Sequence, residues 1–181
     1  MKASRENDQI VLRLAPSEVQ FLRRIFASII RQYSLKPEDV HPRVADVWYS
    51  KRGCVSAGLD EEQTREWIEN LHHLKSANVA ALRRWRRTIA PRGDAIVTLA
   101  LNDEDSQALL TVLNDHRLMC AARHDIGEEE MSIRSLTQIE KLRPRQRGAL
   151  MDVMFLGAII ETLLALLPGG YGDWPLYARQ E

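Results

Sequence analysis

The sequence has little cysteine and lacks the short motifs that carry familiar chemistry. Only two of its 181 residues are cysteines, Cys54 and Cys120, which are too few and too far apart for the disulfide framework of a secreted domain. The chain contains no GxxxxGK(S/T), GxGxxG, GxSxG or HExxH pattern, so no common phosphate, dinucleotide, ester-hydrolase or zinc-protease site is indicated. We therefore expect no metal, no cofactor and no recognisable catalytic site.

The sequence also lacks an excess of charge of either sign. Lysine plus arginine and aspartate plus glutamate both number 25, which gives a formal net charge of zero. A neutral chain has no general attraction to nucleic acid or to a membrane surface, so only a local patch could bind either. The N-terminal residues MKASRENDQ lack the apolar stretch of a secretory signal, and we expect a cytoplasmic protein.

One long apolar run, residues 149–167, is about long enough to span a bilayer. Asp152 and Glu161 lie inside it, and an acid in the middle of a membrane helix costs about 2.5–3.5 kcal/mol on insertion scales. We therefore predict a buried core helix, or a helix shared with a partner, and no membrane insertion.

The spacing of apolar residues predicts one mainly α domain over residues 1–181. Five to six helices surround the central apolar C-terminal helix, and two strands at 9–14 and 94–101 form one short two-stranded β ribbon. Capping residues, prolines and glycines place the main helices at 16–35, 60–90, 103–125, 132–142 and 144–167. Outside these elements we expect a flexible N-terminus (1–8), a loop (51–58) and a C-terminal tail (168–181).

A charged side chain lies on the apolar side of the helix predicted at 103–125. At about 100° per residue, Arg117 falls among the apolar residues of that helix, whereas Asp115 points away. An isolated buried charge is too costly to keep, and Glu161 is the lone acid of the apolar run 153–167. We predict that Arg117 and Glu161 form a buried ion pair that fixes helix register. The alternatives are a shared site for an anionic or peptide ligand, and an arginine whose head reaches water.

Two basic runs raise the question of nucleic-acid binding. The first lies near the end of the helix predicted at 60–90, and the second covers residues 141–147. Such runs are typical of a nucleic-acid footprint, but basic residues are also favoured at helix C-termini by the helix dipole. The candidate contacts are Arg83, Arg84, Arg86, Arg87 and Arg92.

The two cysteines are candidates for a redox site. Cys54 lies in the predicted loop between two glycines, and Cys120 lies on the inner face of its helix. If the loop folds over the helix, the two thiols could form a redox switch. Otherwise they are two free thiols.

Three stretches resemble a bacterial family of unknown function, DUF2017. The segment LNDHRL includes Asn114, Asp115 and Arg117, FLGAIIETL carries Gly157 and Glu161, and VLRLAPSEVQFLRRI fits the family's opening strand and helix. The resemblance covers most of the chain and implies a mostly helical cytoplasmic protein. Some actinobacterial members are described as redox-responsive transcriptional regulators.

These observations order three functional hypotheses. The first is a non-enzymatic regulatory or adaptor protein that acts through protein contacts or self-association, with apolar surface from the last helix or the tail. The second is a nucleic-acid-binding transcriptional regulator that uses the arginine runs. The third is an enzyme of unrecognised type, which requires a pocket where Asn114, Asp115 or His116 converge with other polar groups.

Overall fold

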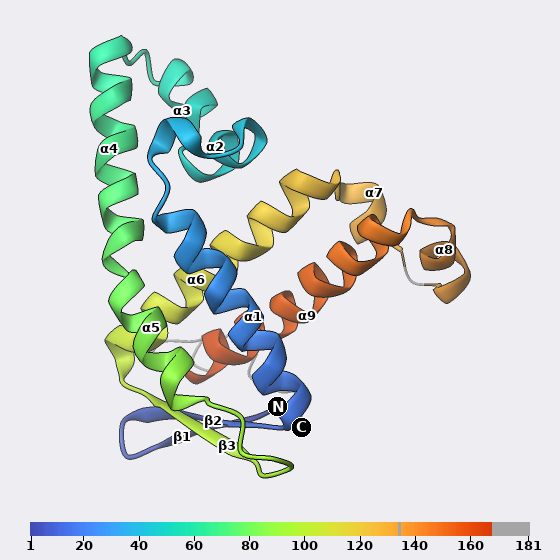
Figure 1. The fold of residues 1–181 in the computed structure, drawn as a ribbon. Helices are drawn as coiled ribbons and strands as arrows, with labels where there is room; N and C mark the ends of the chain where they lie inside the picture. The colour runs from blue at the N-terminus through green and yellow to red at the C-terminus, as the bar shows by residue number, and fades with distance from the viewer. Residues whose placement is uncertain (134, 168–181) are drawn as a thin grey trace, which may run out of the picture.

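Helices dominate the computed structural model, which describes residues 1–133 and 135–167. The mainly α fold, with an apolar helix at its C-terminal end, is the predicted one (Figure 1). The predicted tail, 168–181, lies outside the described residues. The elements in chain order are β1 (Lys2–Glu6), β2 (Gln9–Leu14), α1 (Pro16–Tyr33), the 3-10 turn η1 (Pro37–Asp39), α2 (Pro42–Trp48), α3 (Lys51–Ser56), α4 (Glu61–Ala77), α5 (Val79–Thr88), β3 (Val97–Leu101), α6 (Asp103–His124), α7 (Glu128–Met131), α8 (Leu136–Lys141) and α9 (Pro144–Leu166).

The strands form a three-stranded antiparallel sheet in the order β1-β2-β3, larger than the predicted two-stranded ribbon. The additional strand is β1, which comes from the N-terminal residues that we predicted to be flexible. Asn7 and Asp8 connect β1 to β2 with φ of 48° and 61°, the left-handed conformation that two-residue hairpin turns require. β1 escaped prediction because its sequence, KASRE, has no apolar alternation.

The helix predicted at 60–90 is interrupted at Asn78 and forms two helices, α4 and α5. Asp60 caps α4 as predicted, because its carboxylate accepts a hydrogen bond of 2.8 Å from the backbone N–H of Gln63. No residue of α4 is fully buried, whereas α5 carries Leu82 and Trp85 into the core. Residues 51–56, predicted as a loop, form the short helix α3.

The core is built on the pair of long helices α6 and α9, which make the most extensive contact between elements. Figure 1 shows the two helices side by side with opposite chain directions. α9 buries Leu150, Val153, Leu156, Ile159 and Leu163, so one side of it belongs to the core, as expected under the first of the two alternatives predicted for this helix. α6 also packs against α2 and α1, and its buried residues therefore lie on more than one side.

Among the described helices, α9 alone is long and apolar enough to cross a membrane by length and composition, with a mean hydropathy of 2.0 over its most apolar stretch. Core helices of soluble proteins meet the same two criteria. Only 33% of that stretch is buried within the chain, so α9 also presents much apolar surface to its surroundings.

Candidate functional site

Asp115 lies at the centre of a buried polar cluster that joins four helices. Its Oδ2 accepts hydrogen bonds from the Tyr33 hydroxyl at 2.5 Å and from Lys75 Nζ at 2.7 Å. The indole N–H of Trp48 donates to the Asp115 backbone carbonyl at 2.9 Å. Only 7% of the Asp115 side chain and 12% of the Lys75 side chain are exposed. The cluster thus fixes α6 against α1, α2 and α4.

The electrostatics of this cluster favour one fixed arrangement of protons. Burial, followed by the nearby charge of Asp115, raises the pKa of Tyr33 well above its ordinary value, so the hydroxyl remains a donor at neutral pH. Lys75 Nζ also lies 5.4 Å from the centre of the Trp48 ring, within cation–π range. Because each polar group of the cluster already has a partner, we interpret it as a structural tie.

The predicted buried pair between Arg117 and Glu161 is wrong. Glu161 is exposed on α9, Arg117 is partly exposed, and the structure records no ion pair for either among residues 1–133 and 135–167. The acid that α6 does bury is Asp115, which we predicted to point away from the core. The reason is that α6 packs against α9 on one side and against α2 and α1 on others, so the side opposite its most apolar face is also buried.

The polar residues of the LNDHRL segment do not converge on one pocket. Asn114 is exposed, Asp115 contacts Tyr33 and Lys75, and His116 contacts Cys120. Asp115 and His116 thus each meet other polar groups, but in two separate clusters.

A second buried cluster was not anticipated from the sequence, where we expected no metal site. His116 Nε2 lies 3.4 Å from Cys120 Sγ, and Asp152 of α9 completes a group whose ligand atoms all lie within 4.8 Å of one another. His116 and Cys120 are 6% and 9% exposed. Arg24 Nη2 donates a hydrogen bond of 2.9 Å to Asp152 Oδ1. The signal in the sequence was the His-x-x-x-Cys spacing, which places both side chains on one face of a helix.

Burial controls the protonation of this cluster. Burial, followed by the charges of Arg24 and Arg123, lowers the pKa of His116 to about 4. Burial, followed by the charge of Asp152, raises the pKa of the Cys120 thiol to about 11. At neutral pH His116 is therefore a neutral imidazole and Cys120, in the absence of a bound cation, is a thiol.

Both cysteines are buried free thiols. Cys54 lies on α3 and not in the accessible loop that we predicted. The side chain beside the Cys120 thiol is His116, whereas the redox switch required Cys54 there. The disulfide of the predicted redox switch is thus not formed in this structure.

Arginines from α1 and α5 line one pocket beside the sheet end of the molecule. We call it the arginine pocket: its volume is about 520 Å³ and its lining includes Arg23, Arg83, Arg86 and Arg87. Arg84 instead forms a 2.5 Å ion pair with Asp105, and Arg92 is exposed beyond the end of α5. Three of the five arginines proposed from the sequence therefore share this surface with Arg23.

The second basic run lies elsewhere. Arg143 and Arg145 line a different pocket together with Arg123, at the start of α9. In Figure 1 this end of α9 lies beside α7 and α8, whereas α5 lies beside the sheet at the opposite end of α9. The two runs do not form one continuous basic surface.

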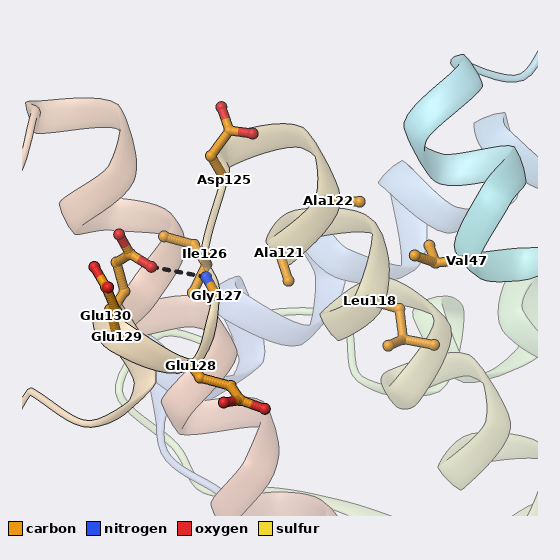
Figure 2. Close-up of a pocket in the computed structure, with 10 residues that line it drawn as sticks. All are labelled: Val47, Leu118, Ala121, Ala122, Asp125, Ile126, Gly127, Glu128, Glu129 and Glu130. Atoms are coloured by element: carbon orange, nitrogen blue, oxygen red, sulfur yellow. Dashed lines mark hydrogen bonds between the residues drawn. The ribbon is translucent and has the colours of Figure 1, made fainter.

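A further hollow lies between α2, the end of α6 and the acidic turn at α7 (Figure 2). Its volume is about 520 Å³, and Val47, Leu118, Ala121 and Ala122 form its apolar wall. Two of its acids are already engaged. The carboxylate of Glu130 accepts a 2.8 Å hydrogen bond from the Gly127 N–H, which caps α7, and Asp125 pairs with Arg43.

The outer face of α9 carries exposed apolar side chains. Met151, Met154 and Phe155 are 55%, 41% and 37% exposed, and the Phe155 ring packs edge-on against Phe21 of α1 at 4.7 Å between centroids. We call Met151, Met154 and Phe155 the α9 outer face. Glu161 shares the exposed part of the helix.

The fold and its sites define a mainly helical domain whose two long core helices carry buried polar clusters and an uncovered apolar face. The family model described as a domain of unknown function (DUF2017) matches residues 1–167, so the chain belongs to that family. No curated protein and no solved structure matches it.

Proposed function

We propose that this protein is a non-enzymatic regulatory or adaptor protein that acts in the cytoplasm through protein–protein contacts. The observation that carries the proposal is the α9 outer face. A helix that is apolar on all sides is normally buried, yet Met151, Met154 and Phe155 of α9 are each more than a third exposed. The two free thiols, Cys54 and Cys120, fit a reducing compartment.

The occupant of this face is a second copy of the chain. The formal net charge is zero, so two copies do not repel one another through a net charge. A twofold dimer, the commonest homo-oligomer, places the same face of both α9 helices in contact. The flexible methionines and the phenylalanine suit the centre of such a contact.

Light scattering over a concentration series tests this contact. We expect the wild type to reach twice the monomer mass of 20.7 kDa. Met151→Glu should raise the dissociation constant of the dimer at least about tenfold, because twofold symmetry places two copies of the new charge in the interface. The matched control is Val55→Glu, which adds the same charge to an apolar residue of α3 that is 78% exposed, and should leave the dimer unchanged. A monomeric wild type, or a dimer that Met151→Glu leaves intact, would contradict the proposal.

The arginine pocket supports a second candidate function, a transcriptional regulator that binds nucleic acid. Arg83, Arg86 and Arg87 share one concave surface with Arg23, and arginine forks match phosphate geometry. Arg23 Nη1 also donates a hydrogen bond to the backbone carbonyl of Arg86. This contact holds the arginine of α1 against α5.

Fluorescence anisotropy with a labelled duplex across a salt series tests this candidate. We expect the triple variant Arg83→Ala, Arg86→Ala, Arg87→Ala to weaken binding at all sequences and to reduce the salt slope by about one for each lost phosphate contact. The control is the double variant Arg143→Ala, Arg145→Ala, which removes arginines at the start of α9, outside the arginine pocket. Absence of binding at low salt, or equal losses in both variants, would rule out the arginine pocket as a nucleic-acid site.

A further inference from the structure

Two potential metal ligands lie on consecutive turns of α6. His116 Nε2 and Cys120 Sγ are 3.4 Å apart. Around a tetrahedral zinc ion, zinc–nitrogen and zinc–sulfur bonds of about 2.0 and 2.3 Å place these two ligand atoms about 3.5 Å apart. The two side chains therefore already stand at the separation that one shared zinc ion demands.

The third ligand comes from the neighbouring core helix. A carboxylate oxygen of Asp152 on α9 lies within 4.8 Å of both the His116 and the Cys120 ligand atoms. To reach the spacing of tetrahedral coordination, each of these two distances has to shorten by at most about 1.5 Å, and rotation of the aspartate side chain is the movement that would shorten them. Three ligands of the right chemical types thus converge from two helices.

The surroundings of His116 leave the imidazole short of partners. His116 is only 6% exposed, and among residues 1–133 and 135–167 its buried Nδ1 has no hydrogen-bond partner. Its other nitrogen faces only the weak hydrogen-bonding group of Cys120. Buried polar atoms without partners are rare in folded proteins. The nitrogen that faces Cys120 is Nε2, so Nε2 is the atom free to bind a metal, and a ligand atom of Asp152 lies within 4.8 Å.

Arg24 orients the carboxylate without closing the site. It donates to Asp152 Oδ1 at 2.9 Å, and this leaves Oδ2 for a ligand. Hydrogen bonds of this kind hold metal-binding carboxylates in place. Arg24 is 62% exposed, so water screens its charge, and the Asp152 side chain is 22% exposed, which provides an entry path.

We propose that His116, Cys120 and Asp152 form a zinc-binding site that links α6 to α9. A set of imidazole, thiolate and carboxylate selects Zn²⁺ over Mg²⁺ and Ca²⁺, which prefer oxygen ligands. On binding, the Cys120 thiol loses its proton to solvent and the thiolate coordinates the ion. Three protein ligands leave the fourth tetrahedral position to water.

Titration of the chelator-treated full chain with Co²⁺, a spectroscopic substitute for Zn²⁺, tests the site. We expect the wild type to bind one equivalent and to develop a near-ultraviolet sulfur-to-cobalt charge-transfer band, which added Zn²⁺ removes. Cys120→Ser, nearly the same size, should lose the band. Cys54→Ser, the matched change at the other buried cysteine, should keep it. A wild type without the band, or a Cys120→Ser variant that retains it, would overturn the proposal.

The other two ligands are tested by affinity. His116→Gln and Asp152→Asn should each weaken Zn²⁺ binding at least tenfold in competition with a coloured chelator, because loss of even an outer-shell partner costs about 10- to 100-fold in affinity. Asp152→Asn keeps the size of the side chain, and far-ultraviolet circular dichroism shows whether each variant is folded. A folded Asp152→Asn variant with unchanged affinity would remove the carboxylate from the site and refute the three-residue proposal.

Discussion

Asp115→Ala is expected to destabilise the protein by about 3–5 kcal/mol, because it removes one partner of a buried ion pair. The substitution leaves Lys75, with only 12% of its side chain exposed, without its carboxylate. It also removes the acceptor of the buried Tyr33 hydroxyl. An unpaired buried charge and an unpaired buried hydroxyl both carry desolvation costs that the wild type avoids. Urea unfolding measured by circular dichroism gives the free energy of unfolding for both proteins.

Two exposed positions serve as controls for this result. Asn114→Ala changes the adjacent, exposed residue of α6, and Glu161→Ala changes the exposed acid of α9. Both should alter the free energy of unfolding by less than about 0.5 kcal/mol. A double-mutant cycle with Lys75→Met should show a coupling energy of about 1 kcal/mol or more. If Glu161→Ala proved costly and Asp115→Ala harmless, the original pair between Arg117 and Glu161 would be restored.

The failure of that pair shows what a helical wheel leaves out. The wheel correctly placed Leu109 and Leu113 in the core, but it assumed one buried side. α6 packs against α9, α2 and α1, so Asp115 is buried although it points away from the most apolar side. A single sequence shows which residues of a helix lie on its apolar side and which on its polar side. It does not show how many neighbouring helices cover the helix.

The opposite error affected α9. Its sequence is almost entirely apolar between residues 149 and 167, so an acid inside it was interpreted as buried. Only part of the helix meets α6, however, and Glu161 lies with Met154 on exposed surface. Composition does not distinguish a helix surrounded by its own chain from one that leaves a face to a partner.

Two sequence patterns that depend only on residues close together in the chain, a helix cap and an apolar spacing, predicted the structure correctly. Asp60 caps α4 through its own side chain, and the spacing within α1 buries Val19, Leu22 and Ile29 as the period requires. The cluster of His116, Cys120 and Asp152 was missed because its third member comes from a helix 32 residues further along the chain than Cys120. Local patterns predict which side chains share a face, whereas sites built from two helices need the packing between them.

Leu156→Ala is expected to destabilise the monomer by about 2–5 kcal/mol, because Leu156 is 0% exposed and the truncation leaves a cavity in the core. The matched control is Met154→Ala, two residues away on the same helix but 41% exposed. This change should cost the monomer less than about 1 kcal/mol. Urea unfolding at a protein concentration well below the dimer dissociation constant measures the monomer alone.

Concentration dependence then separates the two faces of α9. Binding of a second copy stabilises the folded state by mass action, so the wild type should gain stability as its concentration rises. Leu156→Ala should keep that gain, because its cost lies inside the monomer. Met154→Ala should reduce it, because Met154 belongs to the proposed contact. Equal losses from both variants at low concentration would mean that Met154 lies in the core of the monomer, and the assignment of the α9 outer face to a second copy would then fail.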